Sequence, residues 1–452
     1  MHKAIIPLLY VLIFSVSNLF AGNGSKPHYN DKDINHIVSQ LTLEQKARLL
    51  VGCPGSDKGV SHIVAGSAGY TFPIDSLGIP SINLADGPVG VRITPVLPNK
   101  PYTSYCTCFP STTALAATWN KDIARLEGNA IGDEALAYGV DIVLTPGINI
   151  MRNPLCGRNF EYFSEDPYLS GIMGAAMING IQDKGIGASL KHFIANNQQT
   201  GKLYNDARIS QRAIREIYLK GFEICIKNSD PWTVMGSYNK IGGQYTQANP
   251  ELLRTILRNE WNYNGLIVTD WYKKRDTADQ LNGGTDLMMP GEQSQVDEII
   301  AGVKNGRISE TTLNESVKYV LKLISKSISN KGWEYNEAPD LAANAALARR
   351  IATEGMVLLK NDRSFLPISQ GAKIALFGAT AYKSIAGGTG SSNVNKAHIT
   401  DISTGLEKGG YTLSNRLKGL YTKFVEFQND LLDKHPESTD WELSLIHISE
   451  PT

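Results

Sequence analysis

The feature that most constrains the fold is a repeated alternation of short apolar runs with longer segments of helical spacing. The apolar runs lie at 81–87, 112–119, 140–147, 187–193, 232–239, 265–271 and 285–291. Helix-like segments lie between them, at 120–137, 167–182, 210–228, 249–260 and 293–304. Strand–helix units repeated in this way favour a parallel sheet. Their number, over about 300 residues, is typical of an eight-stranded α/β barrel.

Polar side chains stand where several of these apolar runs end, namely Asp86, Thr145, His192, Tyr238 and Asp270. In an α/β barrel the carboxyl ends of the strands form one face, and active sites are built there. A doubly wound open sheet is the alternative fold, but it would gather its functional residues at one switch point. The sequence therefore predicts a TIM-like (β/α)8 barrel with these side chains around its mouth.

The order of the segments predicts how the chain is divided. Before the barrel, 32–51 has helical spacing, and Thr42 with Gln45 three residues later is typical of a capping box. A new apolar strand at 372–380, followed by a glycine-rich stretch at 386–395, indicates a second α/β domain. We expect a signal peptide at 1–22, a barrel domain at 30–325, a linker at 326–350, a partial α/β sandwich at 351–440 and a non-native tail at 441–452.

The first residues have the pattern of a secretory signal peptide. Lys3 precedes an apolar run, and the small residues Ala21 and Gly22 follow that run. A membrane anchor is the alternative, but the run is short for a span and its small-residue exit favours cleavage. We expect export to the periplasm or the medium, with no membrane span after cleavage.

Composition and missing motifs exclude several classes of function. Lys+Arg and Asp+Glu both number 44, so the net charge is zero and a nucleic-acid partner is not expected. The five cysteines are an odd number and indicate no disulfide framework. The chain has no H-E-x-x-H, no paired C-x-x-C and no nucleophile elbow of the G-x-S-x-G type, and its glycine-rich stretch lacks a nucleotide fingerprint. We expect no metal and no cofactor, and the oligomeric state stays open.

Five polar motifs follow one another at the spacing of barrel strands. They are LADGPVGVR at 84–92, GRNFEYFSEDP at 157–167, KHFIANNQQT at 191–200, MGSYNKIGG at 235–243 and VTDW at 268–271. In this order they resemble glycoside hydrolase family 3, the β-glucosidase and β-xylosidase family, over roughly residues 32–410. The resemblance implies a retaining β-glycosidase that hydrolyses terminal non-reducing β-D-glycosyl residues of oligosaccharides or other β-glycosides.

The resemblance also implies roles for particular residues. Asp270 would be the nucleophile, which forms a covalent glycosyl-enzyme. The residues expected to bind or enclose the sugar are Asp86, Arg92, Arg158, Lys191, His192, Lys202, Tyr238 and Trp271. Glu161 and Asp166 are expected to brace the cations rather than to touch sugar. Because a nucleophilic carboxylate must be ionised, we expect Arg158, Lys191 and His192 to hold the pKa of Asp270 low.

Two departures from the family pattern affect what we expect of the chain. Lys202 stands where related sequences carry Arg, so one ammonium replaces a fork of donors. The acid/base of this family is usually a Glu of the second domain, and no Glu in 407–450 matches that role. We therefore expect this Glu beyond the chain as printed, and weak activity on ordinary glycosides, because general acid help is worth about 10²–10⁴-fold.

Three alternatives remain at this stage. A β-xylosidase of the same family would use the same site. A β-N-acetylglucosaminidase would carry an acid/base His on a barrel loop, but the loop after Lys191 has no His beyond His192. A catalytically impaired sugar-binding fragment is the alternative from another class, and the presence of Asp270 argues against it.

Overall fold

A computed structural model describes residues 31–55, 64–94, 103–271, 275–388 and 390–434 of the 452 in the chain. The expected signal peptide at 1–22 and the expected tail at 441–452 lie outside the described residues, and both stay predictions.

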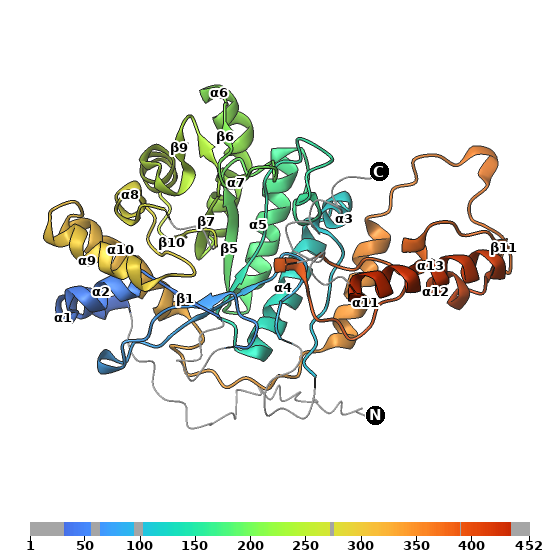
Figure 1. The fold of residues 1–452 in the computed structure, drawn as a ribbon, viewed down its shortest axis with the longest axis horizontal. Helices are drawn as coiled ribbons and strands as arrows, with labels where there is room; N and C mark the ends of the chain where they lie inside the picture. The colour runs from blue at the N-terminus through green and yellow to red at the C-terminus, as the bar shows by residue number, and fades with distance from the viewer. Residues whose placement is uncertain (1–30, 56–63, 95–102, 272–274, 389, 435–452) are drawn as a thin grey trace, which may run out of the picture.

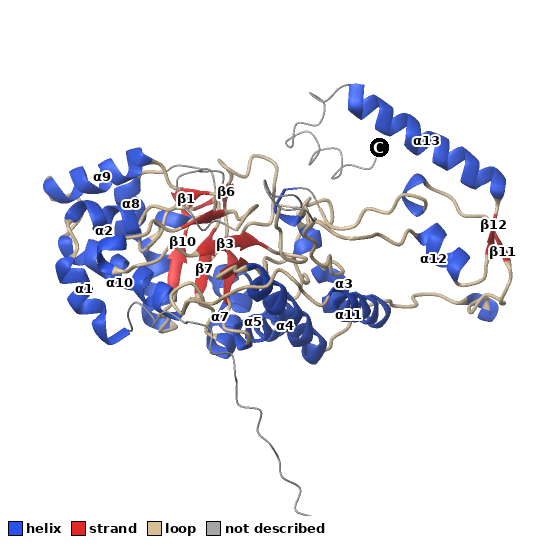
Figure 2. Ribbon diagram, turned by 90° about the horizontal axis from the view of Figure 1, so that it is seen from below, coloured by secondary structure: helices blue, strands red, loops and turns tan. Residues whose placement is uncertain are grey.

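The first part of the structure is built on one seven-stranded sheet with helices around it (Figures 1 and 2). The strands, in their spatial order, are β1 (Cys53–Pro54), β2 (Gly69–Tyr70), β3 (Asn83–Asp86), β4 (Ile142–Leu144), β5 (Gly187–Phe193), β7 (Thr233–Gly236) and β10 (Leu266–Val268). The strands from β3 to β10 pair in parallel, as the sequence predicts. β2 pairs antiparallel with both of its neighbours. The sheet is therefore mixed, because β2, which lies outside the predicted apolar runs, joins it in the antiparallel direction.

The sheet closes through a segment that follows β10. Leu287 forms a parallel bridge with Val268, and Met288 forms another with Val51, just before β1. Gly52 N also donates to Met288 O at 2.9 Å. A closed ring of strands is a barrel, so the TIM-like prediction is confirmed and the open sheet is not what forms.

Two predicted strands differ from the structure. The run at 285–291 contributes only isolated bridges, but it still occupies a strand's place in the barrel wall. The run at 112–119 forms the helix α3 (Thr112–Ala117) instead. Ser111 caps this helix by accepting the Ala114 N–H at 3.3 Å, and the alanines inside it favour a helix.

Helices cover the outside of the barrel, and most lie where helical spacing predicts them. They are α1 (Ile34–Gln40), α2 (Leu43–Leu49), α4 (Lys121–Tyr138), α5 (Pro167–Asp183), α7 (Lys220–Ser229), α8 (Thr277–Gly283), α9 (Gln293–Lys304) and α10 (Glu310–Lys326). The capping box at the start of α2 is confirmed. Gln45 N donates to Thr42 Oγ1, and Thr42 N donates back to Gln45 Oε1.

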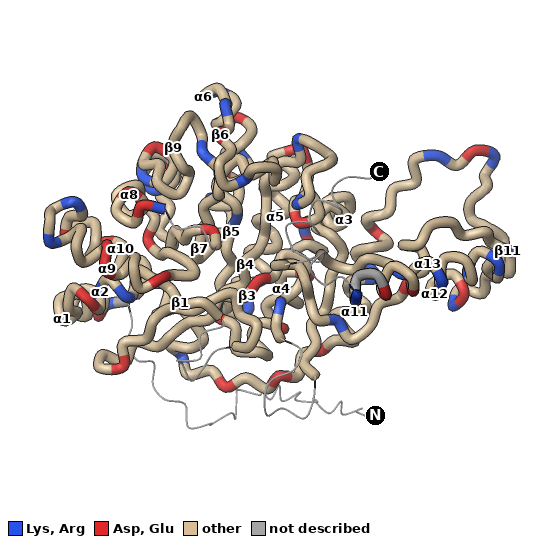
Figure 3. The backbone as a smooth tube through the Cα atoms, viewed as in Figure 1, with Lys and Arg blue, Asp and Glu red and all other residues tan. Residues whose placement is uncertain are grey.

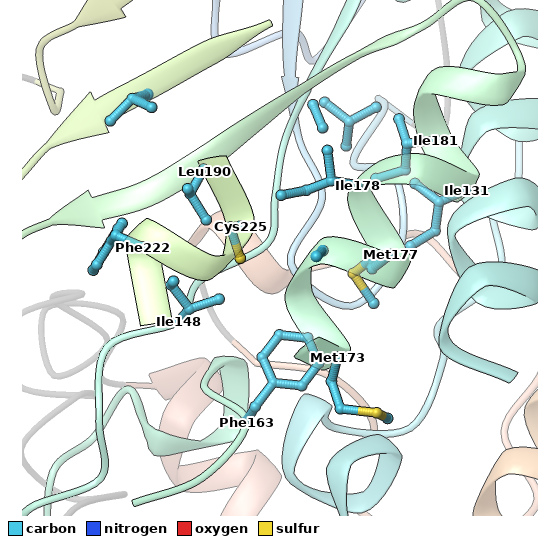
Figure 4. Packing of buried hydrophobic residues seen from close by; sticks show 14 of the residues in the cluster. Ile131, Ile148, Phe163, Met173, Met177, Ile178, Ile181, Leu190, Phe222 and Cys225 are labelled. Atoms are coloured by element: carbon cyan, nitrogen blue, oxygen red, sulfur yellow. The ribbon is translucent and has the colours of Figure 1, made fainter. Parts of the chain in front are cut away.

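The core between sheet and helices is apolar and closely packed (Figure 4). Ile178 and Ile181 of α5 lie beside Ile131 of α4, and Phe222 of α7 lies beside Leu190 of β5. These side chains are buried, which fixes the strands and with them the residues at their carboxyl ends.

The second part of the chain extends away from the barrel (Figures 1 and 2). It contains α11 (Leu341–Glu354), β11 (Lys373–Ile374), α12 (Ile402–Lys408), β12 (Thr412–Leu413) and α13 (Asn415–Lys434), and β11 pairs with β12 in parallel. The predicted linker at 326–350 includes most of α11. The predicted strand at 372–380 is only two residues long and is not buried. Phe377 in this segment is 69% exposed, because little of the described chain packs over it.

One loop of the second part returns to the barrel. Asn395 O accepts the backbone N–H of Cys106 at 2.8 Å, and Val394 is buried in the barrel core. Gly388 approaches the ring of Phe160 so closely that an added Cβ would lie 3.0 Å from Cζ. The glycine-rich stretch predicted at 386–395 is therefore a packing element beside the loop that carries Arg158.

Charged residues of both signs are interspersed along the chain (Figure 3). Within the described ranges, none of the helices has the length and apolar character needed to cross a bilayer.

Candidate active site

Asp270 lies two residues after β10, at the carboxyl end of the strands. Its neighbour Thr269 is tied to Met289, whose N–H donates to Thr269 Oγ1 at 2.7 Å. Asp270 is 6% exposed, and its Oδ1 accepts the backbone N–H of Trp271 at 2.8 Å. Oδ2 is buried and has no hydrogen-bond partner among the described residues. One oxygen is therefore held by the backbone while the other keeps its lone pairs available.

The electrostatics of Asp270 differ from the expectation. Burial raises the pKa of this carboxyl above its ordinary value, and Arg158, Lys191 and Lys202 lower it in part. The cations Arg158 and Lys191 are in place as predicted, but the loss of solvation outweighs them. The prediction of a low pKa for Asp270 was wrong for this reason.

Arg158 links two other residues of the site. Its Nε donates to Glu161 Oε1, and its Nη2 lies 2.9 Å from His192 Nε2. Glu161 has a fully buried side chain and ends the short 3-10 helix η3 (Asn159–Glu161). Glu161 therefore braces the arginine, as the sequence predicts.

His192 lies in β5 and is held at its backbone and at its ring. The side chain of Asn149 bonds both backbone groups of His192. Its Oδ1 accepts the His192 N–H at 3.0 Å, and its Nδ2 donates to the His192 carbonyl at 2.9 Å. Burial, with help from Arg158, Lys191 and Lys202, places the pKa of His192 well below its usual range. His192 is therefore a neutral ring, and the expectation that it acts as a cation toward Asp270 was wrong.

Asp86 and Arg92 form a pair at the end of β3. Arg92 Nη1 lies 3.3 Å from Asp86 Oδ2, and Arg92 N donates to Asp86 O at 2.8 Å. Burial raises the pKa of Asp86, while Lys191 and Arg92 act in the opposite direction. Lys191 is 2% exposed, and burial lowers the pKa of its ammonium against the attraction of Glu161 and Asp86. Lys191 is therefore attracted by carboxylates from two different elements, β3 and η3.

Three further predicted residues surround the nucleophile. Tyr238 donates from its hydroxyl to Trp271 O at 2.7 Å, and Lys202 Nζ lies 4.9 Å from the centroid of the Tyr238 ring. Trp271 is 7% exposed, and its Nε1 donates to Ala68 O at 2.9 Å. These bonds fix the aromatic residues on either side of Asp270.

Asp166 does not brace a cation, although the sequence predicted that it would. Its side chain caps α5 by accepting the Tyr168 N–H at 2.8 Å. Sequence reasoning also missed Tyr162 and Asn149, which hold His192. Tyr162 is part of the quoted motif at 157–167, but an aromatic between Glu161 and Phe163 gave no sign of its hydrogen bonds.

No group of three or more His, Cys, Asp or Glu side chains within the described ranges is arranged to hold a metal ion. All five cysteines are free thiols.

Comparison with known proteins assigns this arrangement to a family. The profile described as "Glycosyl hydrolase family 3 N terminal domain" matches residues 101–323. The chain belongs to glycoside hydrolase family 3. The resemblance that the five motifs indicated is thereby confirmed.

Family 3 relatives match most of this chain. A protein named thermostable beta-glucosidase B, from Acetivibrio thermocellus, is 40% identical over 410 residues, which is 89% of this chain and 51% of the relative. A protein named exo-alpha-(1->6)-L-arabinopyranosidase, from Bifidobacterium longum, is 37% identical over 390 residues, which is 82% of this chain and 49% of the relative. The chain thus spans about half the length of these family 3 relatives.

A solved family 3 structure matches the fold as well. Beta-glucosidase 3B from Thermotoga neapolitana, in complex with alpha-D-glucose, superimposes with a TM-score of 0.85 and 43% identity. The match covers 88% of this chain and 57% of that one. It includes the barrel and supports the TIM-like assignment.

Proposed function

We propose that this chain carries out the covalent step of a retaining β-glucosidase. The observation that carries the proposal is Asp270, whose buried Oδ2 has no hydrogen-bond partner among the described residues and whose carboxylate is acted on by three cations. Retaining glycosidases use such a carboxylate to attack the sugar. Relatives at 40% and 38% identity that are named beta-glucosidases support glucose as the sugar, as does the glucose complex of the Thermotoga neapolitana enzyme.

The remaining site residues have the chemistry of sugar recognition. Asp86 accepts hydrogen bonds from hydroxyls, while Arg158 and Lys191 donate to them. Arg92 holds Asp86 in position, and His192 adds a ring nitrogen beside Arg158. Tyr238 and Trp271 flank the nucleophile, and Lys202 contributes positive charge beside Tyr238. We assign the glucosyl unit to the space between these side chains and Asp270.

The reaction has two steps. Asp270 Oδ2 attacks the anomeric carbon, the bond to the leaving-group oxygen breaks, and that oxygen departs with the bonding electrons. A water molecule then attacks the glycosyl-enzyme ester, releases the sugar and regenerates the Asp270 carboxylate. No described carboxyl is assigned as the acid/base. We propose fast glycosylation by activated aryl glucosides, whose leaving groups need no proton, and slow hydrolysis of cellobiose.

Covalent trapping tests the proposal. The full chain is incubated with an activated 2-deoxy-2-fluoro-β-glucoside, which forms the glycosyl-enzyme but resolves slowly. We expect one added sugar mass, located on Asp270 by peptide mapping and absent in Asp270→Asn. A label on another residue would overturn Asp270 as the nucleophile. Tight sugar binding without any label would leave a sugar-binding protein.

The sugar itself is tested with a panel of aryl glycosides. Relatives named exo-alpha-(1->6)-L-arabinopyranosidase at 37% identity make a pentopyranoside the second candidate substrate. We expect the highest kcat/KM for aryl release with the β-glucoside. A higher value for the α-L-arabinopyranoside, the β-xyloside or the β-N-acetylglucosaminide would reassign the substrate but keep the mechanism.

A further inference from the structure

Both ring nitrogens of His192 have protein partners. Nε2 lies 2.9 Å from Arg158 Nη2, and Nδ1 lies 3.1 Å from the Tyr162 hydroxyl. A guanidinium has only donors, so Arg158 must donate and His192 Nε2 must accept. The proton of the neutral ring is therefore on Nδ1, from which it donates to Tyr162.

The bonds of Tyr162 are complete in this arrangement. Its oxygen accepts from His192 Nδ1 and from Asn196 Nδ2 at 3.0 Å, and its hydrogen donates to the Asn196 carbonyl at 3.3 Å. A phenol offers one donor and two acceptor positions, and all three are used. In the opposite tautomer, an Nε2–H group would face the N–H of Arg158 at 2.9 Å, so that two donors would meet.

The protonated ring is excluded by its surroundings. His192 is 1% exposed and has Arg158, Lys191 and Lys202 as charged neighbours, all of which disfavour a second proton. Nε2 also points toward the nucleophile, at 3.9 Å from Asp270 Oδ2. With a lone pair on Nε2, this contact is not a hydrogen bond, which agrees with the unpartnered state of Oδ2.

We propose that Tyr162 is a positioning residue that fixes His192 as the Nδ1–H tautomer, so that the site selects a sugar hydroxyl that can donate to Nε2. On binding, that hydroxyl replaces the direct contact between Arg158 Nη2 and His192 Nε2, and the guanidinium moves away from the ring to make room for it. It accepts from Arg158 and donates to His192. This inference rests on the proposed sugar-binding function of the site.

The Nδ1–H tautomer of His192 limits which sugars can bind. A fluorine in place of that hydroxyl can still accept a hydrogen bond from Arg158, but it has no hydrogen to donate to His192. A lone pair of the fluorine then faces the lone pair of His192 Nε2 in a buried site. Leaving a buried acceptor without its donor costs about 1–3 kcal/mol, which is about 5- to 150-fold in affinity. One position of the sugar should therefore be intolerant of fluorine.

The first test observes the tautomer directly. Long-range ¹H–¹⁵N correlation spectra of the full chain, labelled in histidine, distinguish the protonated ring nitrogen from the bare one. The His192 signal is assigned by its absence in His192→Gln. We expect the proton on Nδ1 between pH 6 and about 8, since the ring stays neutral over this range. A proton on Nε2, or on both nitrogens, overturns the proposal whether or not the chain has glycosidase activity.

The second test measures selectivity. Glucose and its 3-, 4- and 6-deoxyfluoro analogues are titrated against the full chain and against Tyr162→Phe. The wild type should lose about 10- to 100-fold in affinity at one position. The variant should lose most of that discrimination. In the complex Arg158 donates to the sugar and no longer to Nε2, so without Tyr162 nothing holds the proton on Nδ1 and His192 can take the other tautomer. Equal discrimination in both proteins overturns the role of Tyr162.

Tyr263→Phe is the matched control for this test. Tyr263 is equally buried, but its hydroxyl lies 3.1 Å from the Pro231 carbonyl and 3.2 Å from the Leu266 carbonyl, away from His192. The Tyr263→Phe substitution should leave both the His192 tautomer and the fluorine discrimination unchanged. If glucose fails to bind while His192 still has its proton on Nδ1, the proposed function fails and the tautomer assignment stands.

Discussion

The ammonium of Lys202 lies over the ring of Tyr238, with Nζ 4.9 Å from the ring centroid. The same ammonium is one of the cations that lower the pKa of Asp270 against the effect of burial. Lys202 therefore acts on the nucleophile directly as a charge and contacts the aromatic residue beside it.

Lys202→Met should shift the acidic limb of the pH profile. Without this charge the pKa of Asp270 rises further, so the carboxylate becomes ionised only at higher pH and the limb moves upward. We also expect kcat/KM to fall about tenfold or more at neutral pH, from the loss of a charged donor. Aryl release from an activated glucoside, measured from pH 4 to about 8, checks both effects.

Lys202→Arg is the control for charge. It restores the fork of donors that the family resemblance implies, and it keeps the acidic limb near that of the wild type. An acidic limb that moves equally in both variants would mean that Lys202 acts through packing on Tyr238 and not through its charge.

Asp270→Asn should abolish the covalent step and stabilise the fold. The rate of aryl release should fall by roughly 10⁴-fold or more. The folded-state pKa of Asp270 is raised, so the ionised carboxylate costs stability at every pH above its unfolded value. A neutral amide removes that cost, and the melting temperature at pH 7.5 should rise. Thermal unfolding checks this second effect.

Asp166→Asn is the matched carboxylate control for Asp270→Asn. Asp166 caps α5, and Asn serves equally well at a helix N-cap. Aryl release and melting temperature should both stay close to those of the wild type. A loss of activity in this variant would mean that Asp166 supports the cations after all.

Whether a site residue could be predicted from the sequence depends on where it lies in the chain. Asp86, His192 and Asp270 all follow or end apolar runs, and a parallel barrel brings such ends to one face. The barrel could therefore be predicted from the pattern, and so could the set of residues at its mouth.

Other features depend on packing, which the sequence does not display. The raised pKa of Asp270 comes from burial by distant segments. The hydrogen bond from His192 Nδ1 to the Tyr162 hydroxyl joins residues 30 positions apart. The segment 112–119 was assigned wrongly because a short apolar run reads the same in a helix as in a strand. Its cap at Ser111 was the signal that distinguished the two.

Asn395→Ala should loosen the contact between the second part of the chain and the barrel. The Asn395 side chain donates to the Ser104 carbonyl, and its own carbonyl accepts the Cys106 N–H. Losing the side-chain bond should cost about 1 kcal/mol, so amide exchange at Cys106 should become about fivefold faster. Asn393→Ala, at an exposed side chain of the same loop, should leave that exchange unchanged. Equal rates in all three proteins would contradict the role of Asn395.

Glu127→Gln should stabilise the protein in a pH-dependent way. Glu127 lies in α4 with no exposure, and neither carboxyl oxygen has a hydrogen-bond partner among the described residues. Burial raises its pKa from 4.5 to about 8. Because the folded-state pKa lies above the unfolded value, wild-type stability falls as pH rises from 4.5 toward 8. The Gln variant does not titrate there and should be more stable at pH 8, on the order of 2 to 4 kcal/mol.

Urea unfolding at pH 5 and about 8 measures this difference. At pH 5 the buried Glu127 is neutral in the folded protein, so the two proteins should differ little there. Titration of the nearby Cys108 does not contribute to this difference, since burial raises the pKa of its thiol and keeps it neutral.

Glu134→Gln is the contrasting variant, because Glu134 accepts hydrogen bonds from Thr107 N and from Asn344 Nδ2. It should lose about 1–3 kcal/mol. A Glu127→Gln protein no more stable than the wild type at pH 8 would show that Glu127 does not remain buried as a neutral acid.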